Sequence, residues 1–142
     1  MQNHAIRSRL AKIFTVVMGL AFLEVILQGF LFSGFYARGD RTYLDLHGMV
    51  GELTGDVVIV LIPIGFLARF PRHLRIGWWT VLLAISWNVQ AWVLGGGILE
   101  TRWFEMVHIP LAFGILLLAL YLTIQTRPYS WPKELRAGEH AC

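Results

Sequence analysis

Long apolar stretches alternate with short polar links along the whole chain. Four stretches are apolar nearly throughout, and each could form a helix of about 20 residues, the length that crosses the hydrocarbon core of a bilayer. They cover roughly 13–36, 46–68, 76–99 and 103–125. The strands of a membrane barrel would instead alternate apolar and polar residues. The pattern therefore predicts an all-α, membrane-spanning four-helix bundle that forms a single domain.

Composition supports lipid as the solvent of this chain. Of its 142 residues, 56% are hydrophobic and only 15% are charged, whereas soluble domains carry about 25% charged residues. The predicted spans use most of the chain, so little is left for a separate soluble catalytic module. Whether the protein is an enzyme stays open on this evidence.

Basic residues are distributed unevenly between the predicted links. Nine would lie on one side of the membrane and three on the other, and the positive-inside rule places the richer side in the cytoplasm. We therefore expect a bacterial inner-membrane protein with both termini cytoplasmic and its basic clusters near anionic lipid headgroups. This placement explains the net charge of +3 without a nucleic-acid partner. The richer side holds Arg7, Arg9, Lys12, Arg69, Arg72, Arg75, Arg127, Lys133 and Arg136, and the other holds Arg38, Arg41 and Arg102.

A weak internal repeat relates the two halves of the chain. Gln28 is followed 19 residues later by His47, and Gln90 is followed 18 residues later by His108. The repeat would relate two helical hairpins that run in the same direction. Both histidines would then lie at a similar depth, in the outer part of the second and fourth spans.

Two histidines at one depth on parallel helices favour a haem site. Histidine is a common axial ligand of haem iron, and helical bundles often hold such cofactors in their cores. Gly51 and Ala112 each lie one turn after a histidine, where a small residue lets a flat macrocycle approach the backbone. A copper or zinc ion, chlorophyll magnesium or a purely structural role are the alternatives. Basic side chains on the outer side are candidates to bind the haem propionates, namely Arg38, Arg41 and Arg102.

Polar residues inside the spans form a second group of candidates for a quinone site or a proton path. Ionisable groups in spans are rare and mostly functional, although interhelical hydrogen bonds are an alternative role. At 3.6 residues per turn, Glu52 and Asp56 point about 140° and about 180° away from His47. These acids must line a second interior surface or face a partner. The group consists of Glu24, Gln28, Glu52, Asp56 and Asn88.

The order of these features resembles a family of small four-helix bacterial membrane proteins of unknown function. The resemblance implies the architecture and no established activity. More loosely, the histidines on the second and fourth spans are similar to those of small membrane b-type cytochromes, here in a version with one haem. The matching segments are Leu27-Gln28-Gly29-Phe30, Leu46-His47-Gly48-Met49-Val50-Gly51, Trp87-Asn88-Val89-Gln90 and Val107-His108-Ile109-Pro110.

The leading hypothesis from the sequence is a b-type cytochrome that binds one haem b near the outer face and transfers electrons. It would act as an electron-transfer subunit of a larger redox complex, or as a homo-oligomer, with membrane quinone as a possible partner. A second hypothesis is a non-enzymatic accessory or pigment-binding subunit of a respiratory or photosynthetic complex. A third is a small transporter that uses Glu24, Glu52 and Asp56.

Overall fold

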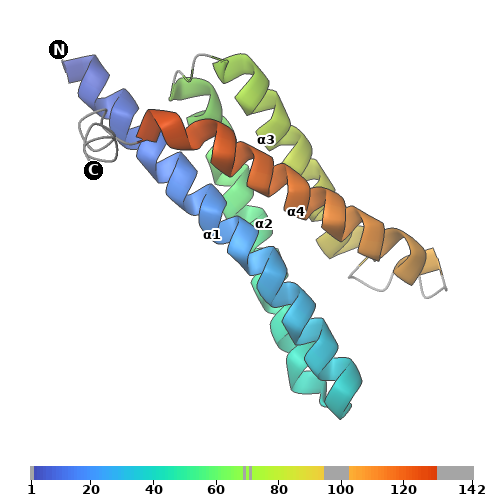
Figure 1. Cartoon of the computed structure of the whole chain (residues 1–142). Helices are drawn as coiled ribbons and strands as arrows, with labels where there is room; N and C mark the ends of the chain where they lie inside the picture. Colours follow the sequence, from blue (N-terminus) through green and yellow to red (C-terminus); the bar gives the residue numbers. More distant parts are fainter. Residues whose placement is uncertain (1, 69, 71, 95–102, 131–142) are drawn as a thin grey trace, which may run out of the picture.

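The computed structural model is all-helical, as predicted, and describes residues 2–68, 70, 72–94 and 103–130 (Figure 1). Helix α1 is long and continuous, α2 and α4 are of similar length, and α3 is shorter and passes directly into a π-helix, η1. The elements are α1 (Gln2–Arg38), α2 (Arg41–Leu67), α3 (His73–Asn88), η1 (Val89–Leu94) and α4 (Trp103–Ser130).

The connection between α1 and α2 is much shorter than the apolar pattern predicts. Only Gly39 and Asp40 separate the helices, so the predicted link between 36 and 46 is wrong in length. Gly39 has a φ of 67°, a conformation that glycine adopts without a steric penalty. Asp40 caps α2 by accepting a hydrogen bond from the Thr42 backbone amide at 2.9 Å. This hydrogen bond lowers the pKa of Asp40 because it stabilises the ionised carboxylate.

Three of the described helices are long and apolar enough to cross a membrane, which indicates a membrane protein. Their candidate spans are Ile6–Arg38, Arg41–Leu67 and Met106–Pro128. The third predicted span, 76–99, differs from expectation because its α-helix ends at Asn88 and six residues of π-helix follow. Its last residues, 95–99, lie outside the part of the chain that the structure describes.

The helices form two hairpins that meet along one half of their length. Helix α1 packs against α2 and α4, and α3 packs against α2 and, over a smaller area, α4. Within the described ranges α2 and α4 are not neighbours, so they stand on a diagonal of the bundle. Figure 1 shows the α1–α2 hairpin diverging from the α3–α4 hairpin, away from the end where α1 begins and α4 finishes.

We call the half in which the hairpins meet the closed half. Its core contains the fully buried side chains of Phe14, Met18, Leu83 and Leu122. Phe14 packs edge-on against Phe70, with ring centroids 5.4 Å apart. Burial of such side chains is the main source of stability in a helical core, and here every helix except the short η1 contributes to it.

The threonine hydroxyl groups that are buried in the closed half are all hydrogen-bonded. Thr15, Thr80 and Thr126 are buried, and each hydroxyl donates to the backbone carbonyl four residues earlier. Such bonds satisfy polar groups inside apolar surroundings. The outer surface of the bundle remains apolar, with Leu53 and Leu117 each 64% exposed, which fits lipid as the surrounding medium.

Candidate functional site

A cavity of about 660 Å³ lies between the diverging hairpins. We call this region, which contains His47 and His108, the open half. Side chains from α1, α2, α3, η1 and α4 line the cavity, and most of them are apolar. Its volume falls within the range of about 300–1,000 Å³ that is usual for small-molecule sites. The polar residues of the lining are Gln28, Ser33, His47, Glu52, Gln90 and His108, together with the indoles of Trp87 and Trp92.

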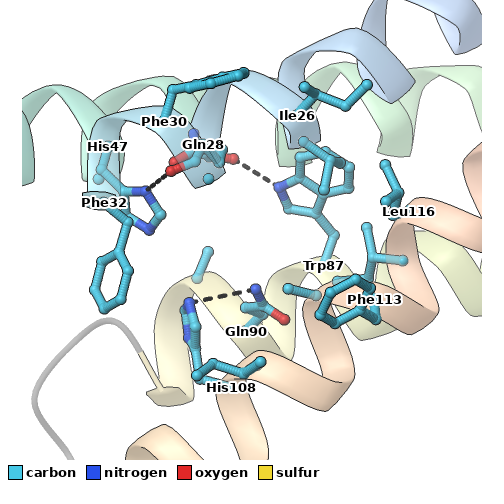
Figure 2. A pocket seen from close by; sticks show the side chains of 18 of the residues that line it. Ile26, Gln28, Phe30, Phe32, His47, Trp87, Gln90, His108, Phe113 and Leu116 are labelled. Carbon is cyan, nitrogen blue, oxygen red and sulfur yellow. Dashed lines mark hydrogen bonds between the residues drawn. The ribbon is translucent and has the colours of Figure 1, made fainter. Parts of the chain in front are cut away.

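Two imidazoles face each other across this cavity (Figure 2). The ring centroids of His47 and His108 are 6.1 Å apart, and the ring planes differ by 42°. Both side chains are partly buried. They come from α2 and α4, the two helices that stand on a diagonal, so their side chains approach each other across the space between the hairpins.

Phe32 forms the third member of a ring cluster with the two histidines. Its centroid lies 5.7 Å from that of His47 and 6.4 Å from that of His108, and its ring is stacked on His108. Since the histidine centroids are 6.1 Å apart, the three rings form a nearly equilateral triangle, and a flat macrocycle held between the imidazoles would require the Phe32 ring to turn aside. Phe32 lines the histidine end of the cavity.

A backbone contact fixes the tautomer of His47. Its Nδ1 lies 3.2 Å from the carbonyl oxygen of Gln28 on α1. A carbonyl oxygen can only accept a hydrogen bond, so Nδ1 must be the protonated nitrogen. The other ring nitrogen, Nε2, then carries the lone pair. This pattern is the usual one in metal-binding histidines, whose second nitrogen donates to a carbonyl or carboxylate.

The second histidine meets a glutamine as well, but through different atoms. The Nε2 of the Gln90 side chain lies 3.5 Å from the Nε2 of His108. Gln90 belongs to η1, and single π-turns occur frequently at functional sites. The internal repeat of the sequence thus corresponds to two real Gln–His contacts, one through a backbone carbonyl and one through a side-chain amide.

Gln28 also joins the cavity to a carboxyl group deeper in the bundle. Its side-chain Nε2 donates a hydrogen bond to Oε1 of Glu24, one turn earlier on α1. Three buried oxygens have no hydrogen-bond partner among the described residues, namely Oε2 of Glu24, Oε1 of Gln28 and Oε1 of Gln90. Buried polar atoms are nearly always hydrogen-bonded in folded proteins, so these atoms mark places where a ligand, water or proton is expected.

The opposite wall of the cavity is held by an indole. Nε1 of Trp87 on α3 donates to the carbonyl oxygen of Gly51 on α2 at 2.8 Å. A Cβ at Gly51 would lie 3.4 Å from Nε2 of Gln28, so this glycine allows α1 and α2 to approach closely. Ala112 on α4 lines the same cavity.

The predicted propionate-binding arginines are not part of the cavity lining. Arg38 and Arg41 are exposed at the tip of the α1–α2 hairpin. The Arg38 guanidinium lies 5.8 Å from the ring centroid of Tyr43, a cation–π arrangement. The third arginine of this prediction, Arg102, lies outside the described residues.

The polar residues that were predicted as one group for a quinone site or proton path lie in different places in the structure. Glu24 and Gln28 form one hydrogen-bonded pair inside the bundle. Glu52 and Asp56 are exposed, so they do not line a second interior surface of the described chain, and Glu52 is among the residues that line the cavity. Asn88 donates from Nδ2 to the carbonyl oxygen of Ala84 within its own helix.

Two cavity residues had no assigned role in the sequence. Gln90 was recognised only as one member of the repeat, and Phe32 was missed. Phe32 lies four residues after Gln28, on the same face of α1, and this spacing could have indicated that both face one site. Nothing in the sequence indicates that the third span changes to a π-helix at the residue before Gln90.

No three His, Cys, Asp or Glu side chains come together as a possible metal site in the parts of the chain that the structure describes. A small metal ion usually needs three or four protein ligands. Haem iron needs at most two, because the porphyrin supplies four nitrogens. Two facing histidines are therefore a sufficient ligand set for haem.

Comparisons with protein-family models, with curated proteins and with solved structures found no match for this chain. The resemblance to a family of small four-helix membrane proteins therefore stays a prediction, and the function is inferred from the geometry of the cavity.

Proposed function

We propose that the protein is a membrane b-type cytochrome that binds one haem b through His47 and His108. The separation of the two rings is the observation that supports this most directly. Metal–imidazole bonds are about 2.0–2.1 Å long and a ring nitrogen lies about 1.1 Å from its ring centre, so two imidazoles on opposite sides of one metal have centres about 6.2 Å apart. The observed distance is 6.1 Å.

The cavity offers suitable surroundings for a flat apolar macrocycle. It is large, apolar and flanked by the small residues Gly51 and Ala112. The hydrogen bond from His47 Nδ1 to the Gln28 carbonyl leaves Nε2 available to the iron. Gln90 Nε2 lies 3.5 Å from His108 Nε2, near the outer limit for a hydrogen bond, so this amide turns aside at little cost when His108 binds.

Electron transfer is the activity that fits two axial histidines. If His47 and His108 both held the iron, no position would be left for oxygen or a substrate. The haem would supply reversible one-electron chemistry, and the two histidines would hold and orient it. We therefore propose an electron-transfer subunit and not a stand-alone enzyme, with membrane quinone as the candidate electron donor.

The proposed topology has four spans with both termini in the cytoplasm of a bacterium. It is supported by the basic residues of the closed half, because Arg9 and Lys12 on α1 and Arg75 on α3 are exposed near the end where α1 begins. The positive-inside rule assigns that end to the cytoplasm. The third span would consist of α3, η1 and residues beyond 94. The histidines would then lie toward the periplasmic face.

Other membrane chains are the expected partners of this protein. Glu52 and Asp56 are exposed on α2 and lie one turn apart within a candidate membrane span. The exposed residues around them in this span are mostly apolar. Carboxyl groups in contact with lipid are unfavourable. A further subunit, or a second copy of this chain, would cover them.

The visible spectrum of the purified protein, oxidised and reduced, tests the haem proposal. The protein is expressed with haem available, and we expect a b-type spectrum that disappears in His47→Ala and in His108→Ala. His73→Ala is the matched control, because His73 begins α3 outside the cavity, and it should retain the full spectrum. Ala112→Trp keeps both ligands but fills the cavity, and it should lose haem binding while remaining folded.

A folded wild-type protein that stays colourless in the presence of haem would contradict the proposal. So would a spectrum that survives both histidine substitutions. An extractable pigment other than haem in the native membrane would support the alternative of a pigment-binding subunit.

A further inference from the structure

Glu24 is an ionisable group that haem ligation does not use. It lies on α1 inside the candidate span Ile6–Arg38, and its side chain is only partly exposed. Oε1 accepts a hydrogen bond from the side chain of Gln28, and Oε2 is buried with no hydrogen-bond partner among the described residues. A carboxyl group in such a position is costly to ionise unless a positive charge is near.

Gln28 connects this carboxyl group to the proposed iron ligand. Its side chain binds Glu24, and its backbone carbonyl accepts the hydrogen bond from His47 Nδ1. Gln28 also lines the cavity, one helical turn from Glu24. Glu24 is therefore one helical turn from a residue that would border the haem, and in a medium of low dielectric constant a charge on one would be felt by the other.

Among the described residues, no lysine or arginine forms an ion pair with Glu24. Helix α2 contributes Arg41, Tyr43, His47 and three acids, namely Asp45, Glu52 and Asp56, and α4 contributes Glu105, His108, Tyr121, Arg127 and Tyr129. The three acids of α2 are exposed. The sequence contains no lysine or arginine between Ile13 and Ala37 on α1, between Thr42 and Leu67 on α2, in η1, or between Met106 and Thr126 on α4.

An oxidised haem with two neutral histidine ligands would supply the missing positive charge. Ferric iron carries one more positive charge than the porphyrin ring neutralises, and that charge disappears on reduction. The ionised form of Glu24 is thus stabilised by the oxidised haem and loses this stabilisation when the haem is reduced. The same electrostatic relation would favour proton uptake by Glu24 as the electron arrives.

We propose that Glu24 is a proton-accepting residue that binds one proton for each electron that enters the haem. One electron comes from the donor, one proton comes from the aqueous phase, and the carboxylate of Glu24 becomes a carboxylic acid. Reoxidation returns both. The inference rests on the proposed haem site and adds to it a coupling between electron transfer and proton uptake.

Redox titration of the haem-loaded protein across pH 5 to 9 tests this coupling. We expect the midpoint potential to fall as the pH rises, with a slope that approaches the one-proton limit of about 59 mV for each tenfold change in proton concentration. Glu24→Gln keeps the hydrogen-bonding capacity at this position and removes the titrating group. Its potential should be nearly independent of pH. Infrared difference spectra should show a carboxylic acid band on reduction in the wild type and not in Glu24→Gln.

Asp56→Asn is the matched control, because it removes an exposed carboxyl group on α2 and should leave the slope unchanged. A haem-loaded wild type with a flat pH profile would overturn the role of Glu24 and leave the haem proposal intact. An unchanged slope in Glu24→Gln would do the same. Absence of haem from the folded wild type would instead overturn the proposed function.

Discussion

The closed half and the open half of this bundle use the same helices for different purposes. In the closed half, Phe14, Met18 and Leu83 are fully buried and the hairpins meet without a large gap. In the open half the hairpins diverge around a cavity, and the side chains that face it include two histidines and two glutamines. Tight packing in the closed half can therefore keep the cavity in the open half from closing. The helices run on through both halves, so the angle at which the hairpins meet also sets how far apart they stand at the cavity.

Removing a core ring from the closed half should have the largest effect on stability. Phe14→Ala deletes a fully buried side chain that packs on Phe70. We expect a loss of about 3–5 kcal/mol in the free energy of unfolding, because the space cannot be refilled. Unfolding in mixed micelles measures this free energy.

Phe30→Ala is the control, because its ring is 70% exposed in the open half, and it should lower the free energy of unfolding much less. Equal losses would contradict the division into two halves.

A methyl group added where α2 and α3 meet should have an intermediate effect. A Cβ at Gly77 would overlap the ring of Phe66, so the ring or the helix must move. We expect Gly77→Ala to lower the free energy of unfolding by roughly 1–3 kcal/mol, the usual cost of overpacking.

Gly114 on α4 provides the matched comparison, since a Cβ there has no heavy atom within 4 Å. Gly114→Ala should leave stability unchanged or raise it slightly, because alanine favours the helix. If both substitutions shift the melting temperature alike in the same micelles, close packing between α2 and α3 is not what restricts position 77.

The smallest effect is expected at the tip of the α1–α2 hairpin, in the open half. The hydrogen bond from Thr42 lowers the pKa of Asp40 in the folded protein. Its stabilising contribution is therefore fully present above the unfolded pKa, about 3.9, and is lost as the pH falls through the lower folded value. Asp40→Asn keeps the cap but cannot titrate. Melting temperatures at pH 7 and pH 3 should show an extra loss in the wild type, and equal losses would contradict this assignment.

Several features of the site could be predicted from the sequence because they depend on spacing along helices. The offset from Gln28 to His47 and from Gln90 to His108 indicated two histidines at a similar depth, and the structure brings both histidines to one cavity. The helical phase of Glu52 and Asp56 relative to His47 indicated that the acids point elsewhere; both are exposed, but Glu52 lines the same cavity as His47, and only Asp56 lies apart from it. Periodicity is a local property, so a single chain is enough to read it.

Other features depend on how the helices pack. The interruption of the third span by η1 places Gln90 beside His108, and nothing in the segment Val89–Leu94 distinguishes a π-helix from an ordinary α-helical span. The distant placement of Arg38 and Arg41 follows from the two-residue turn and the continuous α1. Phe32 became part of the site only because α1 passes between the two histidine-bearing helices.

The sequence by itself determined that this is a helical membrane protein with two histidines at matched positions. The length of an apolar stretch and the spacing of residues along a helix follow directly from the order of the residues. Only the tertiary structure decided that the histidines stand 6.1 Å apart across a cavity. That distance depends on the angle between two hairpins, which is set by side-chain packing between residues that are far apart in the chain.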